Sequence, residues 1–413
     1  MSAAVETYRD DMDVSYAVDF SRDREPTQKR SRFPEYRRKG TAPTRVNGMH
    51  CRRAKRWTWG SGRGARTLNA RAFAGCLAFA VASLSSAVFG VTVDYATVGN
   101  PGNAANGTTG WGAVSDVFKI SKYETSNNDY VDFLNKVDAA GTNPNGVYNT
   151  QMGTDALGGI TFNAAASSGS KYTVKAGTAP SGSSYGTMPV LFTTWFSAAR
   201  FANWLQNGQQ TNSSSMETGA YTLNNQTSGN APARNPGATN FLPSRDEWYK
   251  AAFYNNAGSG SWNTWAGGSN TQPGNTVTNV TLANVANYGG SATPSTNPIG
   301  VGSYINTTSS YGVYDMMGNA TELTDTANAS AQVQLFSGSW GTLLSQATQW
   351  NVTAAATFRS TNNPTPHIGF RVAAVPEPAT IALASVGIAS LAGLDWMKRR
   401  KKKARAANAQ VIA

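Results

Sequence analysis

The positions of the two cysteines constrain how this chain can stabilise its fold more than any other sequence feature does. Cys51 and Cys76 are the only cysteines in the 413 residues, and both lie in or before an apolar segment near the N-terminus. If that segment is cleaved, the mature protein contains neither a thiol nor a disulfide. Its fold then needs another source of stability, and a bound cation can provide one. Histidine is almost as rare, since only His50 and His367 are present, and one histidine in the mature chain leaves little room for a catalytic triad.

Charge is unevenly distributed along the chain. The formal net charge is +12, but residues 1–90 hold 17 basic against 8 acidic side chains and residues 376–413 hold 7 against 2. Residues 91–375, with 11 against 13, are close to neutral. We therefore expect no basic face for nucleic acid and exclude that partner. The middle part is rich in Gly, Asn, Ser, Thr and aromatic residues, which is typical of a loop-rich extracellular domain and too aromatic for disorder.

The N-terminal 90 residues indicate export. Residues 1–48 are polar and charged without apolar periodicity, so they are either a disordered basic arm or lie upstream of a true start at Met49. Residues 49–90 combine a basic segment, a weakly hydrophobic run at 72–89 and small-residue cleavage sites, which is the pattern of a secretory signal peptide. A transmembrane anchor is the alternative interpretation of that run.

The C-terminal residues 376–405 have three parts. Pro376, Glu377 and Pro378 precede an apolar run at 379–394, and a basic tail follows it. The run is slightly shorter than the roughly 20 residues that cross a bilayer upright, and the basic tail is expected to stay cytoplasmic. This arrangement resembles the PEP-CTERM sorting signal, which implies processing by an exosortase and transient anchoring in the membrane. A plain tail anchor is the alternative. We expect the mature protein at the cell surface or in the extracellular matrix.

Between these ends the sequence predicts three modest helices among many short strands and loops. The helices are expected at 127–137, 195–206 and 245–254, each after a residue that can cap its N-terminus. Strands are expected where apolar and polar residues alternate or where short apolar runs occur, at 118–124, 241–243, 332–336, 357–359 and 369–373. Residues 141–187 are expected to form loops and short strands, and residues 255–310 are expected to be mainly loop. The mixture predicts an α+β fold for residues 91–375.

One dense stretch, YGVYDMMGNATELTD at 311–325, differs from the sequence around it. Asp315 and Glu322 are two carboxylates seven residues apart, with Gly318 between them. Such a turn can offer carboxylate and backbone oxygens to calcium, which takes six to eight oxygen ligands. The alternative is a surface turn whose carboxylates cap backbone N–H groups.

This stretch resembles a motif of the formylglycine-generating enzyme, or sulfatase-modifying factor, family. Five further segments resemble family motifs in the same order, over roughly 260 residues, an ordinary domain size. They are FKISKYETSNNDYVDFLNKV at 118–137, MPVLFTTWFSAARFANWL at 188–205, FLPSRDEWYKAAF at 241–253, FSGSW at 336–340 and IGFRV at 368–372. The resemblance implies a loop-rich fold related to the C-type lectin fold.

The resemblance also implies which chemistry to look for. Formylglycine-generating enzymes oxidise a cysteine of a client sulfatase with copper held by two cysteines, which lie between the last two motifs. Here that interval, Gly341–His367, contains no cysteine, and Cu(I) requires soft thiolate ligands. A related branch uses iron held by several histidines, which this chain lacks. Arg359 and Arg371 resemble family arginines without supplying redox chemistry. We therefore expect neither copper nor iron and no catalytic residue.

Calcium is the cofactor that the resemblance favours. By family position, one structural ion would be held by the side chains of Asp315 and Glu322 and by the backbone oxygens of Gly318 and Ala320. A second family site would begin at Asn287 and the backbone oxygen of Tyr288, but the following loop is shortened.

Two functions follow from these observations. The first is an exported, non-catalytic, calcium-stabilised module that binds an extracellular polysaccharide or a surface protein. Its aromatic loop residues could stack on a ligand or pack in the core, namely Tyr254, Trp262, Trp265 and Tyr288. The alternative is an oxidoreductase of the formylglycine-generating type that acts on a client sulfatase.

Overall fold

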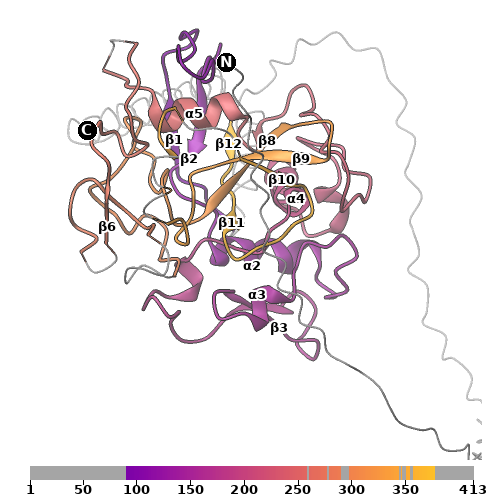
Figure 1. Ribbon diagram of the computed structural model, residues 1–413. Coiled ribbons are helices and arrows are strands. Elements are labelled where there is room, and N and C mark those ends of the chain that lie inside the picture. Colours follow the sequence, from indigo (N-terminus) through magenta and orange to yellow (C-terminus); the bar gives the residue numbers. More distant parts are fainter. Residues whose placement is uncertain are drawn as a thin grey trace, which may run out of the picture. The chain divides into compact units, whose positions relative to one another are not determined.

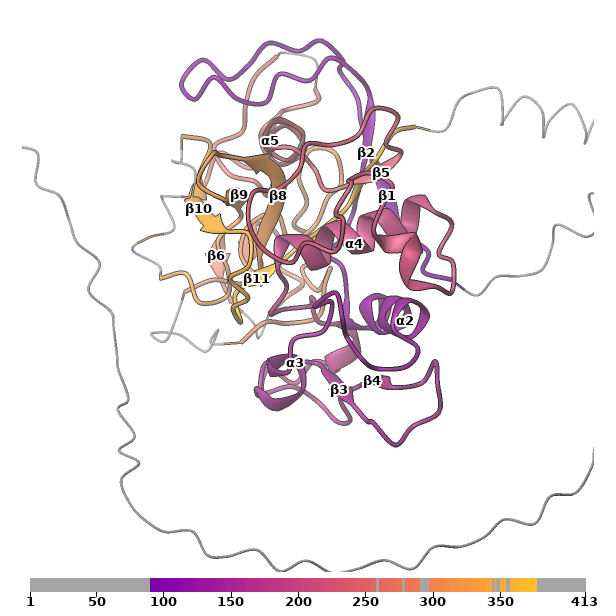
Figure 2. The same ribbon diagram turned by 90° about the vertical axis from the view of Figure 1, so that its right-hand side faces the viewer.

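The computed structural model (Figures 1 and 2) describes residues 90–257, 260–276, 279–289, 297–343, 346, 350–353 and 357–376. The expected N-terminal arm, the signal peptide up to residue 89, and the C-terminal signal from Glu377 onward lie outside these residues. Among the described residues, no helix is long and apolar enough to span a membrane.

The three expected helices are present as α2 (Asn127–Val137), α4 (Trp195–Gln206) and α5 (Arg245–Phe253). Each begins with a complete capping box, in which the N-cap side chain and the third helical side chain bond reciprocally to backbone N–H groups. The pairs are Ser126 with Asp129, Thr194 with Ser197, and Ser244 with Glu247. Local sequence therefore sets where each helix starts. Three single-turn elements were not expected: α3 (Gln151–Thr154), η1 (Tyr185–Thr187) and η2 (Ser213–Met216).

The first sheet joins the two ends of the domain. Its order is β1-β2-β12-β5, formed by antiparallel pairs of short strands. They are β1 (Tyr95–Val98), β2 (Phe118–Ser121), β5 (Asn240–Phe241) and β12 (Ala373–Ala374). The last strand in sequence thus lies between two earlier ones. The expected strand at 118–124 ends at Ser121.

The second sheet has the order β10-β9-β8-β11. It consists of β8 (Thr321–Ala327), β9 (Gln332–Phe336), β10 (Thr357–Ser360) and β11 (Ile368–Gly369). β11 runs parallel to β8, and the other pairs are antiparallel. The expected strand at 369–373 was wrong, because its ends belong to two different sheets.

Two further sheets have two strands each. They pair β3 (Ile160–Phe162) with β4 (Tyr172–Val174) and β6 (Gly274–Asn275) with β7 (Val285–Ala286). The result is a loop-rich α+β domain with small sheets.

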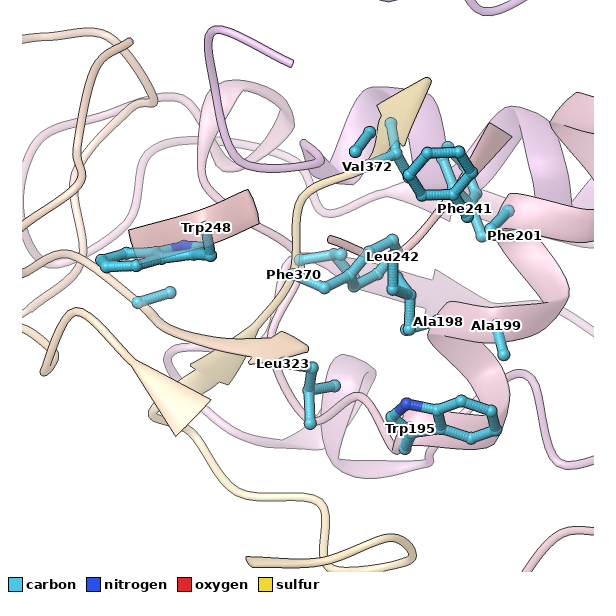
Figure 3. Close-up of a cluster of buried hydrophobic side chains, with 14 of the residues drawn as sticks. Trp195, Ala198, Ala199, Phe201, Phe241, Leu242, Trp248, Leu323, Phe370 and Val372 are labelled. Carbon is cyan, nitrogen blue, oxygen red and sulfur yellow. The ribbon is translucent and has the colours of Figure 1, made fainter. Parts of the chain in front are cut away.

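Side chains from α4, α5, β5, β8 and the segment between β11 and β12 meet in one core (Figure 3). Phe201 of α4 lies 5.5 Å from Phe370, and Trp248 of α5 stacks on Phe336 at 4.7 Å between ring centroids. The chain crosses from the second sheet to the first between β11 and β12, so Phe370 is buried between them. This crossing also places Arg371, the next residue, at the centre of the domain.

Helix α4 is buried almost all round. Its polar residues Arg200 and Asn203 are completely buried. Arg200 pairs with Glu217 at 2.7 Å, and the Asn203 side-chain amide donates to two backbone carbonyls. The loop carrying η2 covers that face and supplies these partners, as buried polar groups require.

Candidate functional site

The stretch at 311–325 forms a tight turn that leads into β8. Asp315, Gly318 and Asn319 have φ angles of 55°, 82° and 58°, a left-handed conformation that glycine adopts most easily. A Cβ atom on Gly318 would lie 2.2 Å from the backbone oxygen of Asn287. Glycine is thus required here both for the conformation and for the close approach of the two segments.

Glu322, on β8, lies in a buried ion pair with Arg371. Both side chains are completely buried. Nε of Arg371 donates to Oε2 at 2.5 Å and Nη2 donates to Oε1 at 2.6 Å, which is a bidentate pair. The indole N–H of Trp248 donates to Oε2 at 2.7 Å. Glu322 therefore connects β8 to α5 and to the crossing segment between the sheets.

Two further buried carboxyl groups surround this pair. Glu124, three residues after the end of β2, accepts from the side-chain amide of Asn319 at 2.7 Å and from the backbone N–H of Ala320 at 2.9 Å. Asp315 accepts from the backbone N–H of Gly302 at 2.6 Å. Sequence reasoning missed Glu124, although it lies within a family-like motif. We name Glu124, Asp315, Glu322 and Arg371 the carboxylate cluster.

The carboxylate cluster carries more negative than positive charge. Burial is the main cause that raises the pKa of Asp315 to about 6; the Gly302 N–H and Arg371 oppose this shift, and Glu322 adds to it. Burial also raises the pKa of Glu124 well above its usual range, with contributions from Asp315 and Glu322. Burial alone would lower the pKa of Arg371, but Glu322 raises it. Three carboxyl groups thus share one guanidinium.

The predicted calcium ligands Asp315, Gly318, Ala320 and Glu322 lie together on this turn, but most of their oxygens have protein partners. The Gly318 carbonyl accepts from the Ser337 hydroxyl at 3.1 Å. A calcium ion would share Glu322 with Arg371 and Trp248. Among the described residues, no three His, Cys, Asp or Glu side chains form a group that could hold a metal. The excess negative charge is what would favour a cation here.

The residues predicted for a second ion have structural partners as well. The Asn287 carbonyl accepts from the backbone N–H of Asn319 at 2.8 Å. The Asn287 side-chain amide donates to Asn297 and Asn319. The Tyr288 hydroxyl donates to the Pro273 carbonyl. Of the predicted processing residues, only Pro376 lies within the described part, and it is half-buried.

An open pocket lies over one face of the second sheet, and one of its lining residues, Thr321, directly precedes Glu322 of the carboxylate cluster. Its volume is about 210 Å³. We name it the Arg359 pocket, after the one permanently charged residue in its lining. The lining comes from β8, β9, β10, β11 and the intervening loops: Thr321, Leu335, Ser339, Gly341, Thr342, Gln346, Trp350, Thr357, Arg359, Thr365, His367 and Ile368.

Eight described residues of the interval 341–367, in which the resemblance placed the family cysteines, thus line this pocket. His367 stacks on Trp340 at 4.7 Å between ring centroids, and its Nδ1 lies 3.3 Å from the Ser339 hydroxyl. Burial and the nearby Arg359 lower the pKa of His367, so the imidazole is neutral at pH 7. The pocket lining offers hydroxyl, amide, indole and guanidinium groups, with a single imidazole and no thiol.

The aromatic loop residues belong to the core, which is the second of the two roles expected for them. Tyr254, Trp265 and Tyr288 are buried. Trp262 is half-buried and lies 5.2 Å from Tyr249 and 5.1 Å from Tyr254 between ring centroids. Their faces are therefore occupied by each other and by α5.

Fold and site define a loop-rich α+β domain with an open pocket on its second sheet and a buried carboxylate cluster. The chain belongs to the family of the sulfatase-modifying factor enzyme 1-like domain, whose pattern residues 100–375 match. No curated protein matches the chain.

Three solved structures resemble the domain. CarF is 19% identical with a TM-score of 0.42, and the match covers 69% of this chain and 99% of that one. Treponema denticola variable protein 1 is 18% identical with a TM-score of 0.42, covering 69% and 95%. PvdO from Pseudomonas aeruginosa is 16% identical with a TM-score of 0.37, covering 69% and 93%.

Proposed function

We propose that this protein is an exported, non-catalytic member of its family that binds polysaccharide in the Arg359 pocket. One observation carries the proposal: described residues of the interval 341–367 line the pocket, and the whole interval contains no cysteine in its sequence. Copper-dependent oxidation needs thiolate ligands, and iron sites of the related branch need several imidazoles. The pocket supplies neither, whereas its hydroxyl, amide and indole groups are those that hydrogen-bond to sugars.

An oxidation assay separates this proposal from the enzyme alternative. The purified protein is incubated with a sulfatase-type cysteine peptide, with and without copper, and formylglycine is measured by mass spectrometry. We expect no conversion above a control without protein. Turnover would instead support an oxidoreductase that acts on a client sulfatase. A screen of immobilised polysaccharides and surface proteins with the same preparation identifies the class of ligand.

The proposal includes one calcium ion at the carboxylate cluster. Three buried carboxyl groups face one guanidinium there, and a divalent cation would offset the remaining charge. Asp315 and Glu322 would supply side-chain oxygens, and Gly318 and Ala320 would supply carbonyls. Oxygen donors of this kind suit calcium. Because it binds only the folded state, the ion would stabilise that state in a domain that has no disulfide bonds.

The proposal places the mature protein at the cell surface or in the extracellular matrix. Its support is the sequence pattern of an N-terminal signal and of a PEP-CTERM signal cut by an exosortase near Pro376, Glu377 and Pro378. Intact-mass measurement of protein from the native host tests this. We expect a start near Val88–Val91 and an end near Pro376–Pro378, and a mature form that retains residues 1–48 or the basic tail would contradict it.

A further inference from the structure

We propose that the Arg359 pocket recognises an anionic group, a carboxylate or a sulfate ester, on an acidic polysaccharide. This inference rests on the proposed binding function and adds the chemical class of its ligand. Three observations support it: the local charge, an indole N–H without an acceptor, and the way β10 presents its side chains.

The first observation is that none of the side chains lining the pocket is acidic. Residues 326–376 contain no Asp or Glu, and their only basic residues are Arg359 and Arg371. The guanidinium of Arg371 is paired with the carboxylate of Glu322 in the core. Arg359 is exposed and forms no ion pair with any described residue. The planar guanidinium suits bidentate binding of a carboxylate or sulfate.

The second observation concerns Trp350. This residue lines the pocket, and its indole Nε1 is buried without a hydrogen-bond acceptor among the described residues. Indole is a donor only, and a buried donor without a partner destabilises the folded state. A ligand oxygen that accepts this N–H would remove that cost. This one donor without an acceptor, together with a guanidinium that forms no ion pair with a described residue, favours a ligand rich in acceptor oxygens.

The third observation is the geometry of β10. Side chains alternate along a strand, so Thr357 and Arg359 point into the pocket while Phe358 points away. The strand is at the edge of its sheet, which leaves the pocket open to solvent on that side. A volume of about 210 Å³ is below the range of about 300–1,000 Å³ for drug-sized ligands. It suits one charged sugar unit of a chain that continues along the surface.

The test is calorimetric titration of the purified protein with three oligosaccharides of equal length: an oligogalacturonate, a heparin fragment and a neutral dextran. We expect binding of at least one anionic ligand, and the first two arms distinguish carboxylate from sulfate. Affinity should fall as salt rises, because exposed charges are screened over about 10 Å at 0.1 M and about 3 Å at 1 M.

Variants locate the binding. Arg359→Gln should lower the affinity at least about tenfold, as expected for losing a charge-assisted bidentate contact. Trp350→Phe keeps the ring without the N–H and should lower affinity by a smaller factor. Lys136→Gln removes one positive charge on α2, outside the pocket lining, and should leave affinity unchanged. Circular dichroism checks that each variant is folded.

The outcomes distinguish this inference from the proposed function. Equal affinity for dextran, or anionic binding that Arg359→Gln and Trp350→Phe leave unchanged, would overturn the inference while the binding module stands. Binding of no polysaccharide, together with peptide oxidation or capture of a surface protein in the earlier assays, would overturn the proposed polysaccharide function itself.

Discussion

Replacing Arg371 by methionine should destabilise the domain more than any other single change in the carboxylate cluster. The guanidinium is completely buried and bonds to both oxygens of Glu322. It also donates to the backbone carbonyls of Ser121 and Tyr314, both at 3.0 Å. Methionine fills much of the same volume, but it leaves a buried carboxylate without a counter-charge and two carbonyls without these donors.

The expected loss follows from these contacts. Breaking a buried ion pair by removing one partner costs about 3–5 kcal/mol. Each of the two lost hydrogen bonds to backbone carbonyls costs about 1 kcal/mol more. A total loss of about 5–7 kcal/mol approaches the whole stability of many domains, which is about 5–15 kcal/mol. The variant should therefore be unfolded or barely folded at 25 °C.

The assay is urea denaturation followed by tryptophan fluorescence, since Trp248 bonds directly to Glu322. Arg371→Lys keeps the positive charge but cannot form the bidentate contact with Glu322, so this variant should fold with an intermediate loss of stability. The double variant Arg371→Met with Glu322→Leu removes both charges, so it should be more stable than Arg371→Met alone. Arg371→Met should also be less destabilised at pH 5 than at pH 8, because a buried carboxyl group with a raised pKa binds its proton at low pH. An Arg371→Met variant within about 1 kcal/mol of the wild type would refute this account.

Three further outcomes are expected. Calcium should raise the melting temperature of the wild type relative to a chelator, by the equivalent of about 2.7 kcal/mol at 100 times its dissociation constant. Glu322→Gln should abolish that response, whereas the control Asp116→Asn, at an exposed position, should keep it. If the wild type melts at the same temperature with calcium and with chelator, Asp315 and Glu322 are purely structural groups. Burial lowers the pKa of Lys250 to about 8 in the folded protein. Between pH 8 and pH 9.5 this side chain is therefore more fully protonated in the unfolded chain than in the folded one. The free energy of unfolding should therefore rise over that window by about 1–2 kcal/mol, and equal slopes for Lys250→Met and the wild type would contradict this. Gly318→Ala should cost at least about 2 kcal/mol in thermal or urea melts because its Cβ would clash with the Asn287 carbonyl, whereas Gly102→Ala, with open space around it, should cost only its φ strain.

The amino-acid sequence by itself determined the helices, the fold class and the family. Each helix starts where a capping residue precedes an apolar pattern, and both signals lie within a few residues of each other in the chain. Motif order over residues 118–372 then indicated the family, which the match to residues 100–375 confirms. The lack of cysteine between 341 and 367 also needed no coordinates.

Only the tertiary structure decided the partners of the charged residues. Glu322 meets Arg371 from 49 positions away, and Glu124 meets Asn319 from 195 positions away. The sequence showed Asp315 and Glu322 as two carboxylates on one turn, but it did not show the guanidinium and the third carboxyl group that reach them. Such contacts depend on how strands from distant segments cross, and that crossing splits the expected strand at 369–373 between two sheets.

The pocket has the same origin. Arg359, Trp350 and His367 are spread over 18 residues of loop-rich sequence without a motif of their own, and they share a lining only because β10 and β11 flank β8 and β9. Burial of Arg200 and of the aromatic loop residues likewise depends on segments that fold over them. Local sequence sets the start and type of an element, because its hydrogen bonds are local. Which side chains stay free to meet a ligand depends on packing between distant segments, which the tertiary structure alone establishes.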